Sequence, residues 1–217
     1  MCEKGPPPRM VKNITSTMVR LPARRDRPPR VGIVANTYGV LPDIVADALA
    51  GVDLILHAGD IGEISVITRL QAIAPVFAVA GDTDNRTNRL PLHRLLKVVG
   101  KSVMLTHGHD VRSVTGTLRG WFGADRSPDA HREQHMTLLR AFPSVDCIVF
   151  AHPAAACRLQ HEHTLVMNPG AVATPSGEVL AAGPSIAVLE LGRVIDGSVV
   201  QLGQGAVGVA RLAPATS

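Results

Sequence analysis

The strongest constraint on the fold is an alternation, from residue 31 onward, of short apolar runs with segments of helical periodicity. Residues 31–35 form the first apolar run, and residues 42–50 then place their apolar side chains on one helical face. The strand-like runs recur at 53–57, 76–80, 102–106 and 146–151, and the helical patterns at 63–73 and 129–142. Near-continuous apolar strands that alternate with helices are typical of an α/β sheet buried on both faces.

The last part of the chain follows a different pattern. Residues 164–168, 185–191 and 194–202 are strand-like and follow one another without intervening helices. The last two runs are separated by Gly192 and Arg193, which suit a tight turn. We therefore expect a second sheet region that is in part antiparallel.

The positive charge of the chain is concentrated near its N-terminus. Residues 1–30 hold eight Lys or Arg against two acidic residues, whereas the rest of the chain is slightly acidic. Because this segment is rich in proline and lacks apolar periodicity, we predict a disordered basic tail over residues 1–29. A globular domain is expected over 30–205 and a flexible tail over 206–217. Nucleic acid is expected as a partner only through the basic tail.

Composition excludes several classes of protein. The apolar runs are far shorter than the roughly 18 residues that a membrane-spanning helix needs, so we expect no membrane span. One Trp, one Tyr and four Phe are too few for a platform that stacks single-stranded bases. Three cysteines without a CxxC pair exclude a disulfide scaffold and a cysteine zinc finger. This cysteine usage fits a reducing compartment, so we expect a cytoplasmic protein.

Polar residues stand directly after the predicted strands, where ligand sites gather in α/β sheets. The candidates at these strand ends are Asn36, Tyr38, Asp60, Asp82, Thr83, His107, His109 and His152. Carboxylate and imidazole ligands together suit a divalent metal ion of borderline hardness. The pattern therefore indicates a metal site, and a purely structural set of turn-capping groups is the alternative.

Six short motifs follow the predicted strands: VGIVANTYG at 31–39, HAGDI at 57–61, GDTD at 81–84, LTHGH at 105–109, AH at 151–152 and NPG at 168–170. In this order they resemble the calcineurin-like metallophosphoesterases, and most closely the small bacterial and archaeal phosphodiesterases. The resemblance covers about residues 30–202. It implies an α/β fold of the αββα type, a four-layer sandwich with two metal ions over the strand ends. In that family a hydroxide between the two ions attacks the phosphorus of a phosphoester.

The resemblance also indicates which metal ligands this chain has kept. One family metal site is altered at three of its four positions, Asn36, Tyr38 and Ala154. The other site keeps its four ligands: Asp60, Asp82, His107 and His152. The two carboxylates carry a charge of −2, which one divalent ion balances. We therefore expect one divalent ion, Mn, Fe, Ni or Zn, and the loss of the second site. A chain that has lost its function and binds no metal is the alternative.

Further roles follow from the resemblance and from side-chain chemistry. We expect the Asn36 amide to position a phosphate during catalysis, and Tyr38 to donate a hydrogen bond to a phosphoryl oxygen. Thr83 is expected to contact the substrate, because it stands where many superfamily members carry the histidine that protonates the leaving group. His109 is then the candidate general acid, since an imidazole titrates near neutral pH. A role for His109 in orienting its neighbours is the alternative.

The predicted function is hydrolysis of a small phosphodiester or phosphoester by a divergent enzyme that uses one metal ion and has reduced activity. The main alternative is a non-catalytic scaffold or binding protein that keeps the fold without turnover. A nucleic-acid binder that uses the basic tail is a third hypothesis. The sequence leaves open the substrate, the native metal and whether the chain forms a homo-oligomer.

Overall fold

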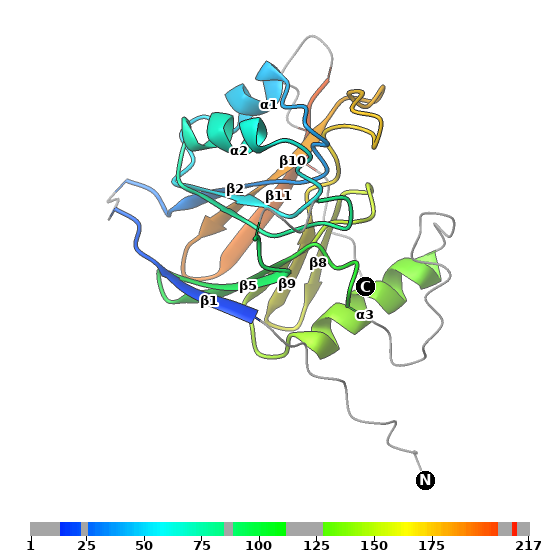
Figure 1. Cartoon of the computed structure of the whole chain (residues 1–217). Helices are drawn as coiled ribbons and strands as arrows, with labels where there is room; N and C mark the ends of the chain where they lie inside the picture. Colours follow the sequence, from blue (N-terminus) through cyan, green and yellow to red (C-terminus); the bar gives the residue numbers. More distant parts are fainter. Residues whose placement is uncertain (1–13, 23–25, 85–88, 112–127, 204–209, 212–217) are drawn as a thin grey trace.

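A computed structural model of the protein describes residues 14–22, 26–84, 89–111, 128–203 and 210–211. Within these residues two six-stranded sheets pack face to face, with helices on their outer faces (Figure 1). None of the helices in this part of the chain has the length and apolar character of a membrane span.

The first sheet, sheet I, combines parallel and antiparallel pairs. Its strand order is β12 (Ala210–Arg211), β11 (Ile195–Gln201), β10 (Ser185–Leu191), β2 (Arg30–Val34), β3 (Leu54–His57) and β4 (Val76–Ala78). The strands β2, β3 and β4 are parallel to one another, whereas β10, β11 and β12 form antiparallel pairs. The antiparallel pairing expected for residues 185–191 and 194–202 is therefore confirmed, but these runs extend the sheet of β2 instead of forming a second sheet region, and residues 164–168 lie in the other sheet.

The second sheet, sheet II, also mixes both kinds of pairing. Its strand order is β1 (Ile14–Val19), β5 (His93–Val98), β6 (Lys101–Thr106), β7 (Cys147–Val149), β9 (Thr164–Asn168) and β8 (Cys157–His161). The pairs β6–β7 and β7–β9 are parallel, so their carboxyl ends point the same way. β8 and β9 form an antiparallel hairpin at one edge.

Three clusters of buried apolar side chains fill the spaces between the layers. The largest lies between the sheets and includes Ile33 and Leu56 of sheet I and Leu105 and Val149 of sheet II. Helices α1 (Asp43–Ala48) and α2 (Ile64–Gln71) pack on the outer face of sheet I, and α3 (Pro128–Ala141) packs on the outer face of sheet II (Figure 1). This arrangement confirms the αββα sandwich that the sequence predicts.

The structure corrects the predicted N-terminal tail. Residues 14–19 form β1, which pairs in parallel with β5 over six residues, so the prediction of disorder over 1–29 is wrong for this segment. Most side chains of β1 are exposed, and main-chain pairing together with the packing of Val19 and Leu21 against the inter-sheet core holds it in place. Arg27 is also ordered, because its guanidinium pairs with Asp53 at 2.7 Å.

The predicted flexible tail over 206–217 needs a smaller correction. Ala210–Arg211 form the two-residue strand β12, which pairs with Val200 and Gln201 of β11. A strand this short satisfies a few edge hydrogen bonds and carries no apolar pattern, so the sequence gives no sign of it. The rest of that predicted tail, and residues 1–13 of the N-terminal one, lie outside the described residues.

Candidate metal centre

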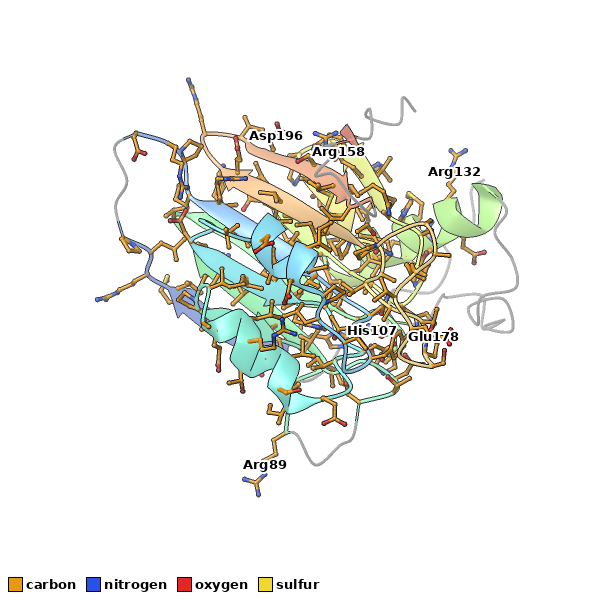
Figure 2. The ribbon with its side chains drawn as sticks, turned by 90° about the horizontal axis from the view of Figure 1, so that it is seen from above. Arg89, His107, Arg132, Arg158, Glu178 and Asp196 are labelled. Carbon is orange, nitrogen blue, oxygen red and sulfur yellow. The ribbon has the colours of Figure 1, made fainter. Side chains whose placement is uncertain are left out.

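The loops that follow five strands meet at one end of the sandwich. The loop after β2 hydrogen-bonds to the loop after β3, where Asn36 N donates to Gly59 O at 3.0 Å. The loop after β7 approaches the loop after β6, where Ala151 N donates to His107 O at 3.2 Å. Figure 2 places His107 inside the molecule, whereas the labelled Arg89 and Arg132 project outward. Loops from both sheets therefore gather at one end of the strands.

Three of the predicted metal ligands lie close enough to share one ion. Asp82, His107 and His152 each offer a ligand atom, and these atoms lie within 4.8 Å of one another. Asp82 Oδ1 lies 3.0 Å from His107 Nε2 and 3.4 Å from His152 Nδ1. A carboxylate between two imidazoles is a mixture of ligands that suits a borderline divalent ion.

The orientation of His107 fits metal binding. Its Nδ1 donates a hydrogen bond to Ala58 O at 2.7 Å, which directs Nε2 toward the carboxylates. Burial opposes the charged imidazolium, but the hydrogen bond with Asp82 and the charge of Asp60 raise the pKa of His107 above its ordinary value. The same hydrogen bond holds the pKa of Asp82 well below its usual range. The carboxylates that favour a proton on His107 Nε2 would also favour a metal cation at that position.

Asp60 lies beside this group of three. Its Oδ2 is 3.5 Å from His107 Nε2 and accepts a hydrogen bond from the Tyr38 hydroxyl at 2.9 Å. Its Oδ1 accepts hydrogen bonds from Thr83 N at 3.1 Å and from Thr83 Oγ1 at 2.8 Å. The hydroxyl protons of Tyr38 and Thr83 are therefore used within the protein. Burial, followed by the charge of Asp60, raises the pKa of Tyr38, so the phenol stays protonated.

The backbone is strained at several of these residues. Four residues of the site have φ values in the left-handed region, which residues other than glycine rarely adopt. The values are 53° at Asn36, 45° at Tyr38, 56° at Asp60 and 70° at His152. Such conformations cost about 1–3 kcal/mol each and persist only where the surrounding structure fixes them. The strain shows that the fold holds these loops in one defined arrangement.

Asn36 and His109 each have a polar atom that no described residue satisfies. Asn36 is 1% exposed, and its amide nitrogen donates to Gly170 O at a long 3.5 Å. Among the described residues, neither Asn36 Oδ1 nor His109 Nδ1 has a hydrogen-bond partner, although both atoms are buried. Burying a polar atom without a hydrogen-bond partner costs free energy unless a ligand or a water molecule supplies the hydrogen bond.

His109 completes a cluster of three imidazole rings. Its ring centroid lies 5.3 Å from that of His107 and 6.5 Å from that of His152. Burial, followed by the positive charge of His107, lowers the pKa of His109. The imidazolium form of His109 is therefore a stronger acid than usual but less populated at neutral pH. Ala154, by contrast, is exposed and carries no donor atom on its side chain.

Two residues behind the ligand loops were not predicted from the sequence. His57 Nδ1 accepts from Gly59 N at 3.3 Å, so Nε2 carries the proton and donates to Thr37 Oγ1 at 3.0 Å. Thr37 Oγ1 in turn donates to Ile61 O at 2.9 Å. Burial lowers the pKa of His57 to about 4, so this chain of hydrogen bonds uses the neutral ring. The signal in the sequence was a histidine at the end of an apolar strand, three residues before Asp60.

The four-layer sandwich and its cluster of carboxylate and imidazole groups at the strand ends define the class of metal-dependent phosphoesterase folds. Residues 30–193 match the family model described as the calcineurin-like phosphoesterase superfamily domain, and the chain belongs to this superfamily. The family uses divalent metal ions, and the described residues supply a three-residue group that could hold one.

Two curated archaeal proteins are similar in sequence. A "probable metallophosphoesterase" of Methanothermobacter thermautotrophicus is 26% identical over 181 residues, which cover 80% of this chain and 92% of the relative. A second protein with this description, from Methanocaldococcus jannaschii, is 25% identical over 150 residues, with coverage of 67% and 69%. Both names agree with the family assignment.

Solved structures with lower identity share the fold. Vacuolar protein sorting 29 from Cryptosporidium parvum is 21% identical with a TM-score of 0.63, and the match covers 86% of this chain and 98% of that one. A predicted phosphoesterase from Streptococcus pneumoniae is 14% identical with a TM-score of 0.56, with coverage of 80% and 89%. At these identities the structures support the architecture alone.

Proposed function

We propose that this chain is a divergent metallophosphoesterase that hydrolyses a small phosphodiester or phosphoester with one divalent ion. The ion is held by four residues: Asp60, Asp82, His107 and His152. The observation that carries the proposal is the convergence of Asp82, His107 and His152 within 4.8 Å, with the Nε2 atom of His107 turned toward the carboxylates.

The chemistry of the donor set supports one ion rather than two. Asp60 and Asp82 together carry the charge that one divalent ion balances, and two imidazoles complete a set suited to Mn, Fe, Ni or Zn. A structure of vacuolar protein sorting 29 from Entamoeba histolytica, 20% identical with a TM-score of 0.61, is described as a complex with Zn²⁺. A protein of this fold can therefore accept a zinc ion, which supports the choice of metal class.

The loss of the second family site is part of the same proposal. Asn36, Tyr38 and Ala154 stand at positions where the family supplies ligands, and only Asn36 keeps an oxygen suited to a metal. The Tyr38 hydroxyl donates to Asp60 Oδ2, so it occupies a lone pair that a bridging carboxylate would offer to a second ion.

Each residue of this site would have its own role in hydrolysis. A divalent ion bound there supplies a Lewis acid and lowers the pKa of water. The Nδ2 of Asn36, which makes a long hydrogen bond of 3.5 Å to Gly170 O, donates to a phosphoryl oxygen and orients it. His109, beside His107 and His152, delivers the proton to the leaving oxygen.

A non-catalytic scaffold is the second candidate, and the pairing of Tyr38 and Thr83 with Asp60 favours it. Hydroxyls that are committed to a carboxylate of the protein offer less to a substrate. A vacuolar protein sorting 29 from Chaetomium thermophilum, 16% identical with a TM-score of 0.54, is described in complex with a cyclic peptide. A chain of this fold can thus present a surface that a peptide recognises.

Turnover of a chromogenic phosphodiester by chelated and reloaded protein separates the two candidates. We expect hydrolysis with at least one of Mn²⁺, Fe²⁺, Ni²⁺ and Zn²⁺, and its loss in Asp82→Asn. Asp196→Asn is the matched control, because Asp196 is an exposed carboxylate on β11 that pairs with Arg158. If the protein binds these ions but hydrolyses the substrate with none of them, the scaffold function is favoured.

A further inference from the structure

We propose that Asp84 is the positioning residue of the metal centre, because its carboxylate ties the loop of Asp60 to the loop of Asp82. This inference rests on the proposed function, since it concerns the residues proposed to hold the ion. Asp84 was not a candidate ligand, and its two oxygens face backbone amides rather than the cluster of ligand atoms.

The contacts of Asp84 are short and buried. Its Oδ1 accepts hydrogen bonds from Ile61 N at 2.8 Å and from Gly62 N at 3.1 Å. Its Oδ2 accepts from Gly81 N at 2.8 Å, and the residue as a whole is 9% exposed. Ile61 directly follows Asp60, and Gly81 directly precedes Asp82. One carboxylate therefore fixes the amide that follows Asp60 and the amide of the residue before Asp82.

The tie is needed because the two loops approach unusually closely. A Cβ atom on Gly81 would collide with the backbone nitrogen and Oδ1 of Asp60. Asp60 itself has a φ of 56°, which the chain does not adopt without support. The carbonyl of Ile61 is held from the other side by Thr37 Oγ1 at 2.9 Å and by Gly39 N at 2.7 Å. Asp84 accepts hydrogen bonds from the N–H groups of the same loop.

The geometry that Asp84 sets is the separation of the carboxylates around His107. Asp82 Oδ1 and Asp60 Oδ2 lie 3.0 Å and 3.5 Å from the same Nε2 atom. If the amides of Ile61 and Gly81 lose their shared acceptor, the loops remain joined through Thr83 and Asp60 but lose the contact that fixes their backbones, and the ligand oxygens separate. Partners that orient metal ligands typically contribute roughly 10–100-fold to metal affinity.

The test compares Mn²⁺ affinity, measured by calorimetry, in the wild-type protein, Asp84→Asn and Asp84→Glu. Asparagine removes the charge and one acceptor, whereas glutamate keeps the charge but displaces the oxygens. We expect both variants to weaken Mn²⁺ binding by roughly 10–100-fold. An effect of charge alone would leave Asp84→Glu at the wild-type affinity, which would overturn the proposal.

Asp146→Asn is the matched control for loss of a structural carboxylate. Asp146 Oδ2 accepts from Ser102 N at 2.7 Å and from Ser102 Oγ at 2.6 Å, so it also ties two segments together, but it lies before β7 rather than at the strand ends. The control should lower thermal stability and keep the wild-type Mn²⁺ affinity. An equal loss of affinity in Asp146→Asn would show a general effect of destabilisation and overturn the proposal.

Amide hydrogen exchange tests the same tie without metal. In Asp84→Asn, exchange at Ile61, Gly62 and Gly81 should accelerate at least tenfold, whereas Ile55 in β3, whose N–H donates to Pro75 O, should keep its wild-type rate. Unchanged protection of the three amides would refute the role of Asp84.

If the wild-type protein binds no Mn²⁺, the proposed function fails and the exchange rates still decide whether Asp84 ties the loops. If both Asp84 variants unfold, wild-type exchange decides: protection of the three amides comparable to Ile55 supports the tie, and rapid exchange overturns it.

Discussion

Replacing Gly81 with alanine tests whether the close approach of the two acidic loops is required. The φ of Gly81 lies outside the left-handed region, so an alanine meets no backbone penalty there. The added Cβ would lie 2.8 Å from Asp60 Cγ, whereas ordinary contact begins at 3.4 Å, and it would collide with the nitrogen and Oδ1 of the same residue. Because these atoms belong to backbone and a buried carboxylate, the loops must move apart.

The expected cost has two parts. Overpacking a well-packed site lowers the free energy of unfolding by about 1–3 kcal/mol. Displacement of Asp60 from His107 should also weaken divalent-ion binding by roughly tenfold or more, which corresponds to about 1.4 kcal/mol. Gly81→Ala should therefore lower both stability and metal affinity.

Urea unfolding of the chelated protein and calorimetric titration with Mn²⁺ measure the two effects. Gly192→Ala is the control, because its Cβ would meet only Val194 O at 3.5 Å and Pro28 Cβ at 3.9 Å, and its φ is also outside the left-handed region. The control should be neutral or stabilising by up to about 1 kcal/mol. A Gly81→Ala protein with wild-type stability and wild-type Mn²⁺ affinity would refute the close approach of the loops.

Tyr38, the strand β1 and His57 can each be tested by substitution or deletion. Tyr38→Phe removes the hydrogen bond to Asp60 Oδ2 and should tighten Mn²⁺ binding by up to about tenfold, whereas weaker binding in the same titration would show that the phenol supports the site. Deletion of residues 1–20 removes β1 and the packing of Val19, and should lower the calorimetric melting temperature by roughly 2–8 °C, so an unchanged value would contradict a packed β1. The pKa of His57 falls from 6.5 to about 4 on folding, so unfolding takes up a proton below pH 6.5. The free energy of unfolding should then fall by up to about 1.4 kcal/mol per pH unit between pH 6.5 and 4, and His57→Gln should reduce this slope in urea unfolding.

The strands that are buried on both faces could be predicted closely from the sequence. β9 and β10 were expected at 164–168 and 185–191, and their bounds are Thr164–Asn168 and Ser185–Leu191. Burial on both faces favours a near-continuous apolar run, and such a run is easily recognised. The helix expected at 129–142 likewise corresponds to α3 at Pro128–Ala141.

Strands with one exposed side could not be recognised in this way. β5 contains Arg94 and Lys97, and the edge strand β8 contains Arg158 and Gln160, so neither forms an apolar run. β1 lies within a basic, proline-rich segment and depends on its pairing with β5, a contact between residues about eighty positions apart. Such pairing depends on tertiary contacts rather than on local propensity.

The proximity of three candidate residues could be predicted from the sequence, but the contacts around them could not. The strand-end rule and the motifs placed Asp82, His107 and His152 together, and the structure brings them within 4.8 Å. The hydrogen bond from Tyr38 to Asp60 depends on a left-handed backbone at both residues, which the sequence does not reveal because neither is a glycine. Contacts that depend on such local strain need the structure.

The number of divalent ions bound per chain decides whether the site holds a single metal ion. Native mass spectrometry of protein that has been chelated, reloaded with Mn²⁺ or Zn²⁺ and desalted counts these ions. We expect one ion per wild-type chain and none in Asp82→Ala, because that substitution removes the carboxylate between His107 and His152. Two ions per wild-type chain would show that the site with Asn36 and Tyr38 still functions, and no bound ion would contradict the metal centre itself.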